Sequence, residues 1–353
     1  MSRIVAVAPA LPDHVYEQQE ITAELSGLIT SDATKRAVLA RFHAGSGIGH
    51  RHTVLPLERY RDLHSFGESN DLWISEGTDL AARAVSAALD AAGLVATDVD
   101  YLLFTSVTGI AAPSIDARLV PRLGLRPNVK RMPSFGLGCV AGAAGLARVH
   151  DYLVGHPDDI AVLLSVELCS LTLQQNDDST ANFVASGLFG DGAAAVVIAG
   201  ERRAAELGLP GPEIVASRST LYPDSESVIG WDIGGTGFRI VLTAAVSNTI
   251  DANIEGDVHS LLAENDLAMA DVGTWIAHPG GPRVLEAFEH GLGLERTDLA
   301  ASWKSLDAVG NLSSSSVLHV LSDVIEQPAG TNGLLFALGP GVTSEYVLLK
   351  WAV

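Results

Sequence analysis

The segment from Pro133 to His150, PSFGLGCVAGAAGLARVH, places a cysteine where covalent chemistry is favoured. Gly136 and Gly138 permit a tight turn, and Cys139 then opens a run of small residues that predicts a buried helix. At a helix start, backbone N–H groups and the helix dipole stabilise a thiolate, which is the nucleophilic form of the side chain. An ordinary packing role is the alternative, because free cysteines are among the most buried residue types.

Two polar residues in the second half of the chain could act together with this cysteine. His278 follows the apolar run TWIA and precedes a Pro-Gly-Gly break, which predicts a side chain held by rigid backbone at a loop-lined site. An imidazolium near Cys139 would lower the pKa of the thiol, and its N–H could donate to an oxyanion. Asn311, in VGNLSSSS, could supply a second donor or simply cap the helix that follows.

An internal repeat predicts that these residues converge. The pattern Leu-x4-Leu-x3-Asp-Val occurs at 89–99 and again at 262–272. Gly138-Cys139 lies about as far beyond the first copy as Gly310-Asn311 lies beyond the second, and a helix of small residues is expected after each. We therefore predict two copies of one mixed α/β unit, residues 1–205 and 206–353, packed so that the turns carrying the three residues meet.

Composition limits the class of protein. The 353 residues are 47% hydrophobic, enough for a large core, and carry a formal net charge of −20 without a basic block. This charge argues against a nucleic-acid partner or an anionic membrane surface, and no apolar stretch is long enough to insert across a bilayer. Two cysteines, Cys139 and Cys169, and the lack of a signal peptide predict a reducing, cytoplasmic compartment. No Cys/His ligand spacing predicts a metal site.

Periodicity predicts the elements that position these residues. A polar helical region is expected between Pro12 and Phe42, and the charged segment 200–213 is the expected boundary between the two units. Strands are expected at 4–8, 101–106 and 160–166 and after the glycines of 187–192, and helices at 78–93, at 115–123 and after Cys139.

Five motifs, in this order and spacing, resemble the chalcone-synthase-like type III polyketide synthases: GLGCVAGAAGLA, LFGDGAAAVVI, WIAHPGGPRVL, GNLSSSSVL and the final LGPGVTSEYVLL. The resemblance covers nearly the whole chain and is nearer to bacterial than to plant members. It implies an α/β fold of the thiolase-like type, a duplicated αβαβα arrangement of five layers, that works as a homodimer. It also implies a catalytic triad at Cys139, His278 and Asn311.

The resemblance implies a reaction as well. Cys139 would accept an acyl group from an acyl-CoA starter. His278 and Asn311 would bind the thioester oxygen of malonyl-CoA, so that loss of CO₂ leaves an enolate on prearranged donors. The enolate would extend the acyl chain over several rounds before cyclisation. CoA thioesters are substrates here and no cofactor is implied; the bacterial pattern favours an alkylresorcinol, an alkylpyrone or a related aromatic product.

The same resemblance indicates residues of the substrate pocket. Phe189 and Phe238 match gatekeepers between a CoA tunnel and the cavity, although packing alone would make them ordinary core aromatics. Cys169 falls where plant members have a cavity-lining threonine. Ala112 falls where they have a larger residue that reaches the partner subunit. Ser313, two residues after the expected triad asparagine, is expected to contact substrate.

Binding of the CoA phosphates is where the sequence departs from the plant members. Arg41 matches one of their basic residues, whereas Val38 and Gly45 occupy the other positions. CoA docking is therefore expected to differ, with three other residues as candidates for the missing positive charge: Lys35, Arg51 and His52.

Three other classes share parts of this pattern. A papain-like hydrolase also orders Cys, His and Asn along the chain, but its C-G-S/A-C-W/Y signature is absent. A β-ketoacyl synthase III of the fatty-acid type shares the fold and triad but makes a single condensation; Phe189, Phe238 and the LGPG end favour the polyketide branch. A non-catalytic binding subunit is expected to lose a triad residue, and all three are present.

Overall fold

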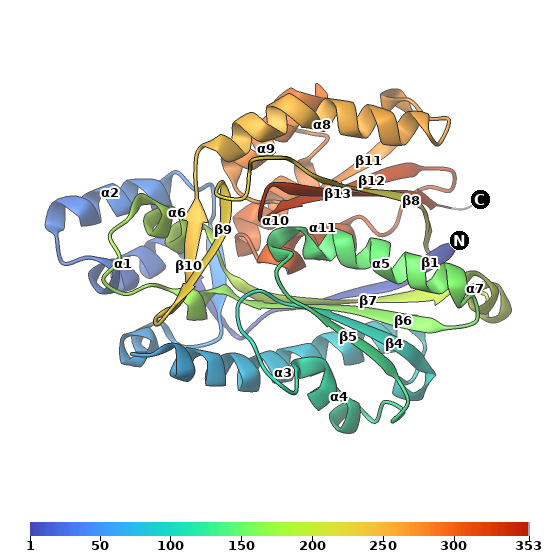
Figure 1. Cartoon of the computed structure of the whole chain (residues 1–353), viewed down its shortest axis with the longest axis horizontal. Coiled ribbons are helices and arrows are strands. Elements are labelled where there is room, and N and C mark those ends of the chain that lie inside the picture. The colour runs from blue at the N-terminus through green and yellow to red at the C-terminus, as the bar shows by residue number, and fades with distance from the viewer. Residues whose placement is uncertain (352–353) are drawn as a thin grey trace.

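The computed structural model describes residues 1–351, which form five layers. Figure 1 shows a central helical layer, α5 (Ala141–Gly155) and α11 (Ser316–Asp323), enclosed between two β-layers. Outer helices cover the far faces: α3 (Phe66–Ala92) and α4 (Ile115–Leu123) on one side, α8 (Ala245–Ala263) and α9 (Pro282–Leu292) on the other. This architecture confirms the predicted five-layered α/β fold.

Hydrogen bonds join the two β-layers into one nine-stranded sheet of order β11-β12-β13-β8-β1-β7-β6-β4-β5. The junction is short, because β1 and β8 pair only where Ser2 and Arg3 face Ile214 and Glu213. The strands are β1 (Ser2–Ala10), β4 (Val99–Thr105), β5 (Lys130–Ser134), β6 (Ile160–Leu168), β7 (Asp191–Gly200), β8 (Pro212–Leu221), β11 (Val272–Ala277), β12 (Asn332–Gly339) and β13 (Thr343–Trp351).

The two halves of the sheet repeat one strand arrangement. β4 runs parallel to β6, β6 antiparallel to β7, and β7 antiparallel to β1. In the same way, β11 runs parallel to β12, β12 antiparallel to β13, and β13 antiparallel to β8. The predicted boundary between the two units, at residue 205, falls inside α7 (Glu201–Leu207), ahead of β8. This boundary stays a prediction.

Near the site, the register of the repeat differs from the predicted one. Single 3-10 turns begin at Gly138 and at Ser313, and both residues have left-handed backbone, with φ of 59° and 51°. Gly138-Cys139 therefore matches Ser313-Ser314 rather than Gly310-Asn311. Asn311 lies ahead of the second turn, where it pairs with Phe189 through an isolated β-bridge.

Two predicted helical regions have different bounds. α3 begins at Phe66, well before Thr78, because a capping box of Ser65 and Glu68 starts it and its first turns lack apolar periodicity. The region between Pro12 and Phe42 holds β2 (His14–Glu17), α1 (Gln18–Ile29) and most of α2 (Ala33–Ala44). β2 pairs with β3 (His50–Thr53), and this long-range pairing leaves no local sequence signal.

Three hydrophobic clusters fill the spaces between the layers. One lies under α3 and α4, one surrounds α5 and α11, and one lies under α8 and α9. Side chains of β6 alternate between them, since Val162 and Leu164 enter the first cluster and Ala161 and Leu163 the central one. A strand buried on both faces explains the continuous apolar run in this part of the sequence.

Close backbone contact holds the central layer together. A Cβ at Gly142 would lie 2.3 Å from the carbonyl oxygen of Ser314 and 2.8 Å from Cγ1 of Val317. Only a residue without a side chain lets α5 approach the turn before α11 this closely. This contact brings the Cys139 turn against the Ser313 turn.

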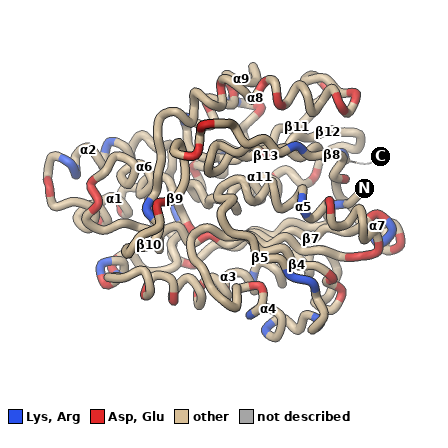
Figure 2. The backbone as a smooth tube through the Cα atoms, viewed as in Figure 1, with Lys and Arg blue, Asp and Glu red and all other residues tan. Residues whose placement is uncertain are grey.

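Charged residues occur mainly in the outer helices and loops, and few occur in the central layer (Figure 2). None of the helices in residues 1–351 is both long and apolar enough to cross a membrane. Cys139 and Cys169 are buried free thiols. Within the described part of the chain, no group of three His, Cys, Asp or Glu side chains could hold a metal ion.

Replacing Gly142 by alanine should destabilise the protein by about 1–3 kcal/mol, because the new methyl group would overlap the Ser314 carbonyl. Gly155→Ala is the matched control, since a Cβ at this last residue of α5 would meet no atom within 4 Å. Urea unfolding followed by far-UV circular dichroism measures both. Equal unfolding midpoints for the two variants would contradict the close contact.

Candidate active site

Cys139 lies in the turn that leads into α5, and its side chain is buried. A Cβ at Gly138 would lie 2.3 Å from Cδ of Pro340, so the proline of the LGPG motif packs directly against this turn. Cys139 Sγ donates to Ser313 Oγ at 3.6 Å. Burial raises the pKa of the Cys139 thiol to about 12, and the hydrogen bond with Ser313 acts in the opposite direction.

His278 and Asn311 are linked through the backbone of Gly280. Asn311 Nδ2 donates to the Gly280 carbonyl at 3.1 Å, and the Gly280 N–H donates to the His278 carbonyl at 2.9 Å. Both side chains are 2% exposed. His278 follows β11, where its N–H donates to the carbonyl of Phe336 on β12 at 2.9 Å. Among residues 1–351, no group partners the buried Nδ1 atom of His278.

Ser313 connects the cysteine to the other two residues. Its backbone N–H donates to Asn311 Oδ1 at 2.8 Å, and this bond fixes the orientation of the amide. Asn311 Nδ2 is then a donor directed toward the loop that holds His278. One hydrogen-bonded path therefore runs from Cys139 through Ser313, Asn311 and Gly280 to His278, so the structure brings the three predicted residues together.

Burial holds both titratable groups of this path in their neutral forms. It lowers the pKa of His278 to about 3, in the direction opposite to its effect on the Cys139 thiol. The predicted imidazolium is therefore not the resting form at neutral pH. Formation of a thiolate at Cys139 therefore requires a group that accepts its proton.

Three predicted pocket residues, Phe189, Phe238 and Cys169, line one internal cavity of about 40 Å³. Phe189 lies beside the candidate triad, because the N–H of the next residue, Gly190, donates to the Asn311 carbonyl at 3.0 Å. Cys169 is buried, which raises the pKa of its thiol. The cavity therefore adjoins the hydrogen-bonded path, and the substrate contacts of its lining residues stay predictions.

Phe238 comes from a separate hairpin, β9 (Ile229–Gly234) and β10 (Gly237–Leu242), which stands apart from the main sheet in Figure 1. Its ring packs edge-on against Phe66 with a centroid distance of 5.3 Å. Gln174 Nε2 donates to the Phe238 carbonyl at 3.2 Å, and its Oε1 accepts from Thr236 Oγ1 at 2.7 Å. Sequence reasoning missed Gln174, since its role depends on contacts with a distant hairpin.

Ala112 does not line the cavity of the two phenylalanines. It lines a second cavity, of about 480 Å³, bounded by residues 109–114, Trp73 and the end of β5. Ile110 and Phe135, which also line it, are each 48% exposed, and the neighbouring Met132 is 52% exposed. This region is an exposed apolar surface at the edge of the sheet.

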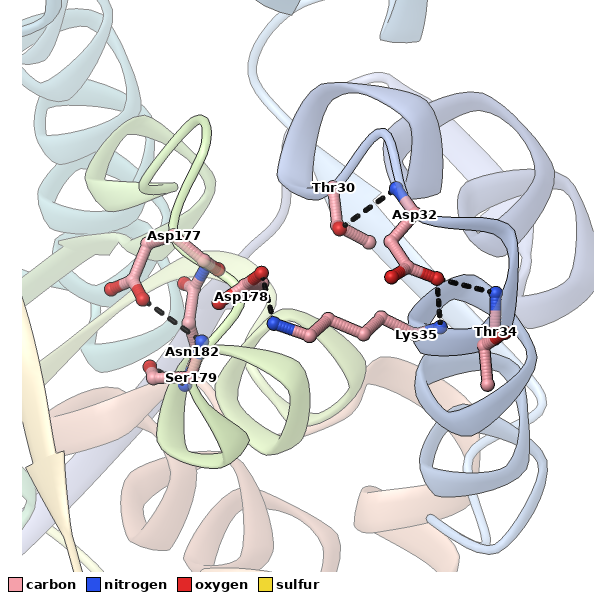
Figure 3. A network of polar contacts seen from close by, with 8 residues as sticks. All are labelled: Thr30, Asp32, Thr34, Lys35, Asp177, Asp178, Ser179 and Asn182. Atoms are coloured by element: carbon pink, nitrogen blue, oxygen red, sulfur yellow. Dashed lines mark hydrogen bonds and ion pairs between the residues drawn. The ribbon is translucent and has the colours of Figure 1, made fainter.

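Arg41, the match to a phosphate-binding residue, lies exposed on α2 and makes no ion pair within residues 1–351. Lys35, at the start of the same helix, is bound to Asp178, in the loop before α6 (Thr180–Leu188), as Figure 3 shows. Asp32 caps this helix end by accepting from the N–H of Thr34 at 2.7 Å (Figure 3). Asp178 therefore already offsets part of the positive charge that Lys35 would offer to a phosphate.

The other two candidates for binding the CoA phosphates, His52 and Arg51, are less exposed to solvent than Lys35. His52 Nδ1 contacts the Pro12 carbonyl at 2.7 Å, and its ring is only partly exposed. Arg51 is 4% exposed and lines the same cavity as Phe189, so its expected role at a surface phosphate is wrong. Sequence spacing alone does not reveal that β3 turns this side chain inward.

Models of known families match the chain over nearly its full length. "Chalcone and stilbene synthases, N-terminal domain" matches residues 1–202, and the corresponding C-terminal domain matches residues 213–352. The chain belongs to the chalcone and stilbene synthase family. It is a type III polyketide synthase, an acyl-transferring, condensing enzyme.

Individual relatives agree with this family. A 1,3,6,8-tetrahydroxynaphthalene synthase from Streptomyces peucetius subsp. caesius is 52% identical over 351 residues, 99% of this chain and 93% of the relative. The crystal structure of the Streptomyces coelicolor A3(2) enzyme of the same name has a TM-score of 0.92 at 30% identity, with 99% of each chain covered. Polyketide synthase PKS-I from the brown alga Ectocarpus siliculosus has a TM-score of 0.92 at 28% identity, covering 99% and 98%. The thiolase-like fold is thereby confirmed, and the fatty-acid alternative is not favoured.

Removing the Ser313 hydroxyl should slow alkylation of Cys139 by iodoacetamide about threefold to tenfold, because the thiolate loses a hydrogen-bond donor. Ser305→Ala is the control, since the Ser305 hydroxyl is buried but has no partner within residues 1–351. Peptide mass mapping separates alkylation of Cys139 from that of Cys169. Unchanged rates in Ser313→Ala would show that this contact does not stabilise the thiolate.

Proposed function

We propose that this enzyme condenses malonyl-CoA units into a polyhydroxylated naphthalene of the 1,3,6,8-tetrahydroxynaphthalene type. The observation that carries the proposal is the 52% identity, over nearly the whole chain, to a relative named for that product. A naphthalene skeleton can be assembled entirely from two-carbon units, so no aromatic or fatty acyl starter is required. This product falls among the related aromatic products expected from the sequence and takes the place of the alkylresorcinol or alkylpyrone.

Acyl loading is the first proposed step. Cys139 Sγ attacks the thioester carbonyl of the priming CoA ester, and its proton passes to the neutral imidazole of His278. The C–S bond to CoA breaks, and CoA leaves as a thiol after taking up a proton. The result is an acyl thioester on Cys139 at the start of α5.

Decarboxylation and condensation follow at the same site. Asn311 Nδ2 and an N–H of His278 donate to the thioester oxygen of malonyl-CoA, where negative charge develops. The bond to the carboxylate breaks, CO₂ leaves, and the electron pair forms an enolate held by these donors. The enolate carbon attacks the Cys139 thioester and releases the thiolate for the next round. The aromatic side chains that line the cavity, the partly buried Phe189 and the buried Phe238, favour neutral CO₂ over the charged carboxylate.

Two further expectations from the sequence stand as proposals. Every step above uses only side chains and CoA thioesters, so we propose that neither a metal nor a redox cofactor takes part. The free thiols Cys139 and Cys169 suit a reducing compartment, which supports the proposed cytoplasmic location.

Purified protein incubated with malonyl-CoA alone should release CoA and form tetrahydroxynaphthalene or its oxidised quinone, identified by mass spectrometry. Octanoyl-CoA and benzoyl-CoA are added in parallel to test other starters. A single condensation on malonyl-carrier protein, with no product from CoA thioesters, would assign the enzyme to fatty-acid-type condensation instead.

Substitutions should separate the two proposed roles. Cys139→Ala should abolish acyl loading, measured as the mass of the intact protein after incubation with an acyl-CoA. His278→Ala and Asn311→Ala should chiefly slow malonyl-CoA decarboxylation, by about 100-fold to 1000-fold for each lost donor. His290→Ala, at an exposed histidine of α9, is the control. Polyketide formation by Cys139→Ala would rule out the covalent mechanism.

We also propose that the enzyme is a homodimer that uses the exposed apolar surface around Ala112. Ile110, Met132 and Phe135 form a patch beside the edge strand β5, and such a patch is typical of a protein interface. A second copy of this chain is the proposed occupant, in agreement with the homodimer that the family resemblance implies.

Met132→Glu should shift the protein toward a monomer, because the interface would then bury an unpaired carboxylate. Leu207→Glu is the control, at an isolated exposed leucine that ends α7. Sedimentation velocity at several protein concentrations measures the oligomeric state. A wild-type protein that remains monomeric at all concentrations would contradict the proposed dimer.

A further inference from the structure

Arg51 is a buried cation in the wall of the cavity that holds Phe189 and Cys169. It lies on β3, which pairs with β2 and directs the side chain inward. Burial lowers the pKa of its guanidinium to about 10, so the group remains positively charged at neutral pH. A charge in this place requires a physical explanation, because ions are costly to remove from water.

The hydrogen bonds of Arg51 leave part of the guanidinium free. Nε donates to Gln18 Oε1 at 2.9 Å, and Nη1 donates to the Phe189 carbonyl at 2.7 Å. Nη2 is buried and has no partner within residues 1–351. A guanidinium presents five N–H donors in a rigid plane, and a buried donor without an acceptor is destabilising. The free edge of Arg51 therefore has the capacity to bind an oxygen ligand.

No carboxylate forms an ion pair with this cation in the described chain. The charge of Asp191 favours the protonated form of Arg51, but Asp191 forms no ion pair with it, and its oxygens accept from the N–H of Ser170 at 2.7 Å and that of Val54 at 2.8 Å. His43 also lies near Arg51, but burial lowers its pKa to about 3 and keeps its ring uncharged. Neighbouring side chains therefore do not supply an acceptor for Nη2 of Arg51.

We propose that Arg51, through Nη2, binds the oxygen atoms of the growing poly-β-ketone chain and thereby selects an oxygen-rich chain over an alkyl one. The inference rests on the proposed function. Each condensation adds a carbonyl group, and 1,3-diketones enolise readily, so the chain carries acceptors that a buried guanidinium binds strongly. An alkyl chain in the same cavity would cover the cation without offering it an acceptor. Arg51 is thus a specificity-determining residue of the cavity.

A purely structural role is the competing explanation. Nη1 holds the carbonyl of Phe189, and loss of that contact would disturb the cavity wall for every substrate alike. A specificity role therefore predicts that loss of Arg51 changes the ratio of activities with different starters. A purely structural role predicts that all activities fall together and that this ratio stays the same.

The experiment compares two product-forming rates in each variant: malonyl-CoA alone, and malonyl-CoA with octanoyl-CoA. Arg51→Met replaces the cation by an apolar side chain of similar length. It should shift the ratio of the two rates toward the octanoyl-primed product by about tenfold or more, because the poly-β-ketone chain loses one hydrogen bond to a charged group. Arg51→Lys keeps the charge and should stay within about threefold of the wild-type ratio. If Arg51→Met does not fold, Arg51→Gln, which removes the charge but keeps a polar side chain, takes its place.

Gln18→Met is the matched control, because it removes the acceptor of Arg51 Nε and disturbs the same wall but leaves the charge. It should lower both rates in parallel. Parallel loss of both rates in Arg51→Met and in Gln18→Met would overturn the inference while leaving the proposed function intact. A wild-type enzyme that forms no product from CoA thioesters would overturn the proposed function and, with it, this inference.

Discussion

The structure depends on one close contact, between the turn that carries Cys139 and the turn formed by Ser313 to Ser315. The backbone of α5 approaches Ser314 where Gly142 has no side chain, and Pro340 fills the space beside Gly138. Residues from both halves of the sheet meet at this point, although the two halves share only a short strand junction. Each member of the hydrogen-bonded path from Cys139 to His278 is attached to one of these turns or to a loop bonded to it.

Burial governs the electrostatics of the site. Removal from water keeps the thiol of Cys139 and the imidazole of His278 neutral, and it raises the pKa of the nearby Glu167 to about 7. Glu167 remains in the interior because it accepts hydrogen bonds from the N–H of Val107, at 3.1 Å, and from neighbouring hydroxyl groups. In such surroundings a hydrogen-bond donor stabilises developing charge more strongly than it does in water. In the same buried environment, Nη2 of Arg51 has no hydrogen-bond partner among residues 1–351.

Polar side chains from distant segments hold the aromatic walls of the cavity. Arg51 fixes Phe189 through its carbonyl group, and Gln174 fixes Phe238 in the same manner. The rings are therefore positioned through their backbones and do not depend on ring packing alone. Because the N–H of Gly190 donates to the Asn311 carbonyl, the segment that carries Phe189 is also bonded to the candidate triad.

The sequence by itself determined the elements and the reacting groups, since these depend on local patterns. The continuous apolar run of β6, the helix of 115–123 and the left-handed stop of α3 at Gly93 are all readable from neighbouring residues. The repeat and five motifs indicated Cys139, His278 and Asn311 and the layered fold. Only the tertiary structure decided the register of the second turn, the inward direction of Arg51, the contact of Gln174 with its hairpin and the placement of Ala112 outside the cavity of the phenylalanines. These features arise from contacts between segments far apart in the chain, and burial, which sets the protonation of the site, exists only once those segments have packed together.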